Sequence, residues 1–213
     1  MTPYYEEPGI TIYHGDCREI LPTLPKVDLV LTDPPYGLKW SSNGSLPQFS
    51  DRWHVGMEWD SRPDRETLRA VIDAGRQFVI WGGNYFAGDL GDCPGVLVWD
   101  KKTGANSFSD AELAWSNLTG TTRIFSHQWC GAFKDSEHGL KSEHPTQKPE
   151  ALMLWCLGLA KDVKSCIDPF MGGGTTLIAC KKSKIDCIGI ERNERYCEIA
   201  VNRLRQGVLW GAS

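Results

Sequence analysis

An acidic residue, two prolines and a tyrosine follow one another at Asp33-Pro34-Pro35-Tyr36, directly after the apolar segment 27–32. Prolines fix φ and carry no backbone N–H, so the carbonyl groups beside them are held as free acceptors. A carboxylate and one such carbonyl can together accept both hydrogens of an NH2 group, and the tyrosine ring can cover an aromatic plane. The tetrapeptide therefore indicates a pocket for a flat aromatic amine such as a nucleic-acid base. Taken alone, it equally fits an ordinary strand end.

A glycine-rich segment, DPFMGGGTT at residues 168–176, lies between an expected strand and an expected helix. Glycines let the backbone approach a ligand closely, and the N–H groups at the start of the helix face it. Glu191 comes nineteen residues after Gly172, at the end of the next expected strand, where a carboxylate suits the hydroxyls of a ribose. The segment lacks the lysine of a P-loop and the G-x-G-x-x-G spacing of dinucleotide sites. It therefore predicts a nucleoside site, against the alternative of a tight turn with incidental glycines.

Strand and helix patterns alternate along the chain, which predicts a doubly wound α/β fold. Nothing divides the sequence, so we expect one domain over residues 1–213, with irregular insertions at 37–63 and 100–143. Unbroken apolar runs such as 27–32 suit parallel strands that are buried on both faces. Strands are expected at 10–13, 27–32, 77–81, 95–100, 112–116, 165–167 and 185–191, and helices at 17–24, 64–75, 149–160, 175–184 and 194–206.

Together the two motifs resemble those of S-adenosylmethionine-dependent DNA amino-methyltransferases, which act on adenine N6 or cytosine N4. The order, with residue 33 before residue 168, is similar to that of the β class, in which the catalytic tetrapeptide precedes the cofactor loop. Three further segments match the family: HGDC at 14–17, FVIWGGNYF at 78–86 and HPTQKP at 144–149. The whole chain looks like the compact phage and prophage enzymes of this class. The resemblance implies a mostly parallel, Rossmann-like methyltransferase sheet in circularly permuted order.

The resemblance also implies roles for the residues of the tetrapeptide. Asp33 and the carbonyl of Pro34 would accept hydrogen bonds from the target amine, with Pro35 completing the catalytic motif, and Tyr36 would stack on the base. The family commonly has serine at the place of Gly173. Loss of that hydroxyl removes one hydrogen bond, worth about 1 kcal/mol, and does not threaten the assignment.

The same resemblance implies a set of residues that bind S-adenosylmethionine. Phe170, Gly172 and Gly174 would line its methionine end, Glu191 would hold the ribose, and Asp16 the adenine. Thr146 and Lys148 are expected at the cofactor carboxylate, although a lysine before proline equally fits a solvated charge. The complete expected set is Asp16, Cys17, Thr146, Lys148, Asp168, Phe170, Gly172, Gly174, Thr175 and Glu191.

The expected chemistry follows from the amine, whose lone pair is conjugated with the ring. Two acceptors that pull on its hydrogens would tilt it toward tetrahedral geometry, with the reacting methyl in line at roughly 3–3.5 Å. No covalent intermediate is needed, so Cys17 is expected to contribute packing rather than a nucleophile. In duplex DNA the enzyme would have to flip the target nucleotide out of the stack.

Composition limits the partners. The net charge is −4, so we expect modest, salt-sensitive affinity for DNA, which formation of a homodimer would raise. Eight scattered cysteines without a C-x-x-C pair indicate buried free thiols rather than disulfides or a metal site. No apolar run approaches the ~20 residues of a membrane span, and the N-terminus has no signal-peptide pattern, so we expect a location in the cytoplasm of a bacterium or a phage-infected cell.

Three functions stay open at this point. A DNA adenine-N6 methyltransferase leads, because cytosine-N4 enzymes more often carry serine at the position of Asp33. An enzyme for an RNA base or a protein glutamine, typically with Asn first, is disfavoured by the motif order and the HPTQKP segment. A catalytically silent nucleic-acid-binding relic is disfavoured by the intact Asp33, Tyr36 and Glu191. The recognition sequence is expected to be read by segments 37–63 and 100–143, whose small size suggests a short target.

Overall fold

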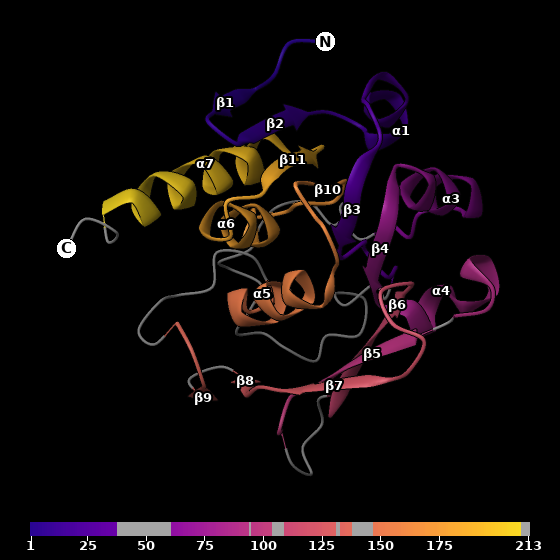
Figure 1. Ribbon diagram of the computed structural model, residues 1–213. Helices are drawn as coiled ribbons and strands as arrows, with labels where there is room; N and C mark the ends of the chain where they lie inside the picture. Colours follow the sequence, from indigo (N-terminus) through magenta and orange to yellow (C-terminus); the bar gives the residue numbers. More distant parts are fainter. Residues whose placement is uncertain (38–60, 94, 104–108, 131–132, 138–146, 210–213) are drawn as a thin grey trace, which may run out of the picture.

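The protein is organised around one nine-stranded, mostly parallel sheet (Figure 1). The computed structural model describes residues 1–37, 61–93, 95–103, 109–130, 133–137 and 147–209. In spatial order the strands are β1 (Tyr5–Glu7), β2 (Ile10–His14), β11 (Asp186–Glu191), β10 (Ser165–Asp168), β3 (Val27–Thr32), β4 (Gly75–Trp81), β6 (Ala111–Ser116), β5 (Gly95–Asp100) and β7 (Arg123–Ser126). Strands β2, β11, β10, β3 and β4 run parallel, whereas β6 is antiparallel to β4 and β5. The expected α/β class with a mostly parallel sheet is confirmed.

Helices cover both faces of the sheet, as the doubly wound prediction requires. One face carries α1 (Cys17–Ile20), which continues into the 3-10 turn η1 (Leu21–Thr23), together with α3 (Arg65–Asp73) and α4 (Gly83–Leu90). The other face carries α5 (Glu150–Leu159), α6 (Thr175–Lys182) and α7 (Glu194–Leu209) (Figure 1). Local sequence sets these elements: Asp64, for example, accepts a hydrogen bond from the N–H of Thr67 at 2.8 Å and so caps α3.

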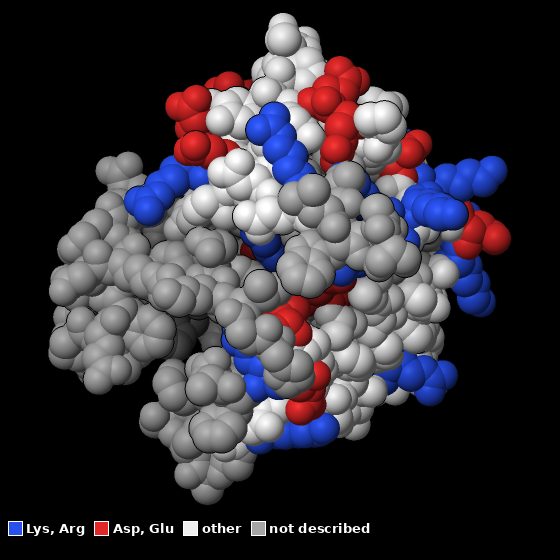
Figure 2. All heavy atoms as spheres, turned by 90° about the vertical axis from the view of Figure 1, so that its left-hand side faces the viewer, with Lys and Arg blue, Asp and Glu red and all other residues white. Residues whose placement is uncertain are grey.

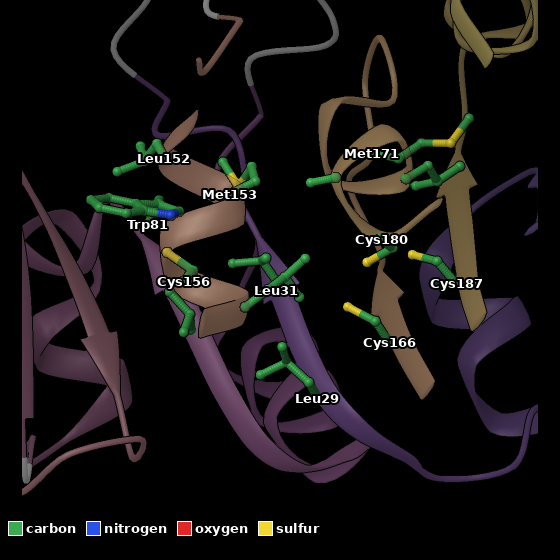
Figure 3. Packing of buried hydrophobic residues seen from close by; sticks show 14 of the residues in the cluster. Leu29, Leu31, Trp81, Leu152, Met153, Cys156, Cys166, Met171, Cys180 and Cys187 are labelled. Atoms are coloured by element: carbon green, nitrogen blue, oxygen red, sulfur yellow. The ribbon is translucent and has the colours of Figure 1, made fainter. Parts of the chain in front are cut away.

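Two hydrophobic cores fill the spaces between the sheet and its helices. On the α5–α7 face, Leu29 and Leu31 of β3 pack near Met153 of α5 in a cluster that is almost entirely buried (Figure 3). In the same core the sulfur atoms of Cys166, Cys180 and Cys187 point toward one another (Figure 3). These three cysteines are free and buried, as expected from the sequence.

The structure differs from the expectations mainly around the insertions. Segment 100–143 is not irregular throughout, because it supplies β6 and β7 to the sheet and forms a hairpin of β8 (Trp129–Cys130) and β9 (Phe133–Lys134). No helix was expected between residues 83 and 90, where the structure has α4; Gly82 precedes its first residue with φ +75°. The short edge strands β1 and β7 were also missed. Most of segment 37–63 lies outside the described residues. Within the part of the chain that the structure describes, no helix is long and apolar enough to cross a bilayer.

Candidate active site

The carboxyl ends of four parallel strands meet at one edge of the sheet and enclose a cavity of about 300 Å³. Strands β3 and β10 are neighbours in the sheet although they are far apart in the sequence. Open α/β sheets bind ligands at such a point, where the strand order reverses. The tetrapeptide follows β3, and the glycine segment follows β10. The walls that come from the strand ends include Asp16, Cys17, Asp33, Pro34, Pro35, Tyr36, Asp168, Phe170, Gly172, Thr175 and Glu191. Both motifs therefore face one cavity.

Two carboxyl groups stand side by side at the ends of β3 and β10. The hydroxyl of Thr32 donates to Oδ1 of Asp168 at 2.6 Å, and the N–H of Phe170 donates to the same oxygen at 3.1 Å. Burial raises the pKa of Asp168 to about 7. Asp168 thus links the end of β10 to the end of β3. Asp33 directly follows Thr32, the last residue of β3, and lines the cavity.

Asp33 is held by two donors. The Tyr36 hydroxyl donates to its Oδ1 at 2.5 Å, and Nζ of Lys148 donates to its Oδ2 at 2.5 Å. Burial raises the pKa of Asp33, and the Lys148 ammonium opposes that shift. The tetrapeptide therefore presents an oriented carboxyl group at the wall of the cavity, as an acceptor for an amine requires.

The tyrosine of the motif is fixed from the opposite side by α4. Its ring stacks on Tyr85 with a centroid distance of 4.7 Å and meets Phe86 edge-on at 6.0 Å. A Cβ on Gly82 would lie 2.1 Å from Cε1 of Tyr36, so only glycine allows this approach. Sequence reasoning missed this support, although the pair Gly82-Gly83 directly after a strand was its visible signal.

Lys148 is buried, with an exposed fraction of 5%, so its interpretation as a solvated charge is wrong. Its Nζ lies 3.1 Å from Oε2 of Glu112 on β6 and 3.3 Å from the Tyr36 hydroxyl. Burial works against the charged form, but the carboxylates of Asp33 and Glu112 outweigh it and raise the pKa of Lys148. Glu112 was not expected at the site; a carboxylate within an otherwise apolar strand was the signal for it. Thr146, the other residue expected at the cofactor carboxylate, lies outside the described residues.

The glycine segment and Glu191 form a second constellation in the same cavity. The N–H of Gly172 donates to Oε2 of Glu191 at 3.1 Å, and the N–H of Asn193 donates to Oε1 at 2.8 Å. Burial raises the pKa of Glu191, and these hydrogen bonds oppose the shift. Gly174 has φ +79°, and a Cβ there would lie 2.8 Å from Cβ of Ala200, so this glycine serves the packing of α6 on α7.

The segment after β2 lies beside the end of β11, where the N–H of Gly15 donates to the carbonyl of Glu191 at 2.9 Å. Asp16 caps α1 by accepting from the N–H of Arg18 at 2.9 Å and pairs with the guanidinium of Arg18, which lowers the pKa of Asp16. Cys17 is buried, and burial raises the pKa of its thiol to about 11. A thiol with that pKa is a poor nucleophile at neutral pH, which agrees with the packing role expected for it.

The three clustered cysteines of the core are the group of possible metal ligands among the described residues. They supply three thiols, whereas structural zinc sites use four ligands. Three thiolates around a divalent ion would also leave a net negative charge in an apolar core. We therefore assign this cluster to packing.

The surface charge agrees with the composition. On the face shown in Figure 2, basic and acidic side chains are interspersed rather than separated. The net charge of the chain is −4. This mixture supports the expectation that electrostatic attraction to DNA is modest.

Comparisons with known proteins agree with this geometry. The type II methyltransferase M.HinfI of Haemophilus influenzae is 28% identical over 92% of this chain and 68% of its own length. M2.LlaDCHI of Lactococcus lactis subsp. cremoris is 24% identical over 98% of this chain and 94% of its own.

Two solved structures resemble the fold. The M1.HpyAVI–SAM complex shares 27% identity and a TM-score of 0.60 over 92% of this chain and 98% of that one. The cytosine-N4-specific PvuII methyltransferase, at 15% identity, shares the fold with a TM-score of 0.63 over 94% of this chain and 88% of its own. The N6/N4 DNA methylase family model matches residues 80–202. The chain therefore belongs to the N6/N4 DNA methylase family, as its two motifs predicted.

Proposed function

We propose that this protein transfers the methyl group of S-adenosylmethionine to the exocyclic amine of a DNA base, most specifically to N6 of adenine. One observation carries the proposal: the Asp33 carboxyl group and the glycine segment with Glu191 open into the same cavity. An acceptor for an amine and a site for a nucleoside are thereby placed within reach of each other.

The residues present suit S-adenosylmethionine. Glu191 offers a carboxylate for the ribose hydroxyls, and its present partners are backbone N–H groups that hold it in place. Phe170, Gly172 and Thr175 line the cavity with it, as do Asp16 and Cys17, which follow the neighbouring strand β2. When bound, S-adenosylmethionine supplies an electrophilic methyl group on its sulfonium.

Residues of the tetrapeptide prepare the amine. Asp33 accepts a hydrogen from the target NH2 group, the carbonyl of Pro34 accepts the second, and Pro35 keeps this turn rigid. Tyr36 stacks on the base. These two hydrogen bonds localise the lone pair of the nitrogen, which is the change that makes a conjugated amine nucleophilic. After transfer, the methylated nitrogen releases one proton to Asp33 or to water. The target nucleotide is flipped out of the duplex to reach this position.

Adenine is favoured over cytosine by the first residue of the tetrapeptide. Asp33 stands where cytosine-N4 enzymes of this family more often carry serine. We assign the chain to the β class and to the compact phage-like type by its motif order, and place it in the cytoplasm, in a restriction–modification or phage setting. Segments 37–63 and 100–143 would read the recognition sequence, and a homodimer would raise the affinity for DNA.

Product analysis tests the proposal. Purified protein with tritiated S-adenosylmethionine and unmethylated DNA should label the DNA, and digestion should release labelled N6-methyladenine. Label in N4-methylcytosine would change the target base while leaving the family chemistry intact. Label only in RNA or protein would remove the assignment to DNA.

A further inference from the structure

A row of alternating charges runs from the cavity into the sheet. Asp33 contacts Lys148, Lys148 contacts Glu112 on β6, and Glu112 pairs in turn with Lys101 at the end of β5. Lys148 is the most buried of the four, with a side-chain exposure of 5%, against 20% for Asp33 and 19% for Glu112. A charge this deep persists only when it is paired.

We propose that Lys148 is a positioning residue that keeps Asp33 in its carboxylate form, and that Glu112 anchors Lys148 in that place. This role rests on the proposed function, in which Asp33 accepts a hydrogen from the target amine. A neutral, protonated Asp33 would turn a donor toward the amine and lose its pull on the amine hydrogens. The free lone pairs of the carboxylate still leave room for the amine beside Lys148 and Tyr36.

The charges around Asp33 explain why one lysine decides its state. Asp33 faces Lys148, the hydroxyl of Tyr36, and the carboxyl groups of Glu112 and Asp168. Among the described residues that face Asp33, Lys148 is thus the one cation, and Glu112 and Asp168 are acids. Without it, burial and the two neighbouring acids would act together to favour protonated Asp33. Lys101 reaches Glu112 and not Asp33, so it does not replace Lys148.

The test is the pH dependence of methyl transfer by Lys148→Met, which keeps the length of the side chain and removes its charge. Without the ammonium, burial and the neighbouring acids raise the pKa of Asp33 further, so a smaller fraction of Asp33 is ionised at pH 7. The rate at pH 7 should fall by about tenfold or more, and it should recover as the pH is raised and Asp33 ionises. The acidic limb of the profile should therefore move to higher pH.

Glu112→Gln gives the opposite prediction and serves if Lys148→Met fails to fold. Glutamine has the shape of glutamate, and its amide oxygen can still accept a hydrogen bond from Lys148, so the lysine keeps its place. The substitution removes only the negative charge that faces Asp33, so the acidic limb should move to lower pH. Lys182→Met is the matched control, because it removes a lysine from an ion pair with Glu150 outside the cavity. Its profile should coincide with that of the wild type.

A second readout does not depend on activity. Carbon-13 NMR of the Asp33 carboxyl group, assigned with Asp33→Asn, should show it titrating at higher pH in Lys148→Met than in the wild-type protein. Variants that lose activity equally at every pH, with unchanged titration of Asp33, would overturn the role of Lys148. Wild-type protein that methylates no DNA would overturn the proposed function instead, while the NMR titration would still decide the state of Asp33.

Discussion

Gly82 supports the catalytic tetrapeptide from the far side, and its replacement by alanine should disable catalysis while sparing the cofactor site. Gly82 adopts φ +75° at the start of α4, and an added Cβ would lie 2.1 Å from Cε1 and 2.6 Å from Cζ of Tyr36. Carbon atoms normally approach no closer than about 3.5–4 Å, so the ring must move by about 1.5 Å.

That displacement sets the magnitude of the effect. Tyr36 donates to Asp33 at 2.5 Å, and a shift of about 1.5 Å breaks this bond and tilts the stacking surface. A misplacement of about 1 Å costs on the order of 100-fold in rate. The positive φ adds a stability cost of about 1–2 kcal/mol for alanine. Gly82 is not part of the cavity wall, so the affinity for S-adenosylmethionine should change little.

Single-turnover methyl transfer and calorimetric titration of S-adenosylmethionine measure the two effects separately. Gly88→Ala is the control in the same helix, because a Cβ there meets nothing within 4 Å. It should leave the rate unchanged and stabilise α4 slightly. A Gly82→Ala protein with a near wild-type rate would refute the claim that the position of Tyr36 governs catalysis.

Two further predictions concern the carboxyl groups of the cofactor side. Glu191→Ala should raise the Kd for S-adenosylmethionine by about 10- to 100-fold, because a hydrogen bond to a charged group contributes about 1.5–3 kcal/mol. An unchanged Kd in calorimetric titration would contradict this prediction. Burial raises the pKa of Asp168 from 3.8 to about 7. Between these two pH values the folded state holds a proton that the unfolded state has released, so the free energy of unfolding falls as the pH rises from about 4 to about 7. In thermal melts without cofactor, the Tm of Asp168→Asn relative to wild type should therefore rise between pH 5 and pH 8; a constant difference would contradict the shift.

Local patterns predicted most of the sheet and its helices. Strand β3 was visible because a strand buried on both faces reads as an unbroken apolar run, and it spans residues 27–32 as expected. Strand β7 was missed because a four-residue edge strand with exposed side chains carries no such run. Helix α4 was missed because two glycines at its start read as a turn, whereas Gly82 begins the helix in the left-handed conformation.

The sequence motifs predicted the site residues that they contain. They did not predict the ion pair between Lys148 and Glu112, which depends on the tertiary fold. Asp33, Gly172 and Glu191 line the cavity because each stands at or just after the carboxyl end of a parallel strand. The contact between Lys148 and Glu112 joins a residue of the irregular segment before α5 to a residue of β6, and only the tertiary fold brings the two together. The spacing of the two residues in the sequence does not predict this contact.

The central claim is that Asp33 activates the target amine while a separate set of residues holds the cofactor. Methyl transfer from labelled S-adenosylmethionine to DNA, measured beside cofactor affinity for wild type and Asp33→Ala, tests it most directly. We predict that the wild type labels DNA and that Asp33→Ala loses at least about 100-fold in rate with nearly unchanged affinity. An Asp33→Ala protein that still methylates DNA at the wild-type rate would contradict the mechanism.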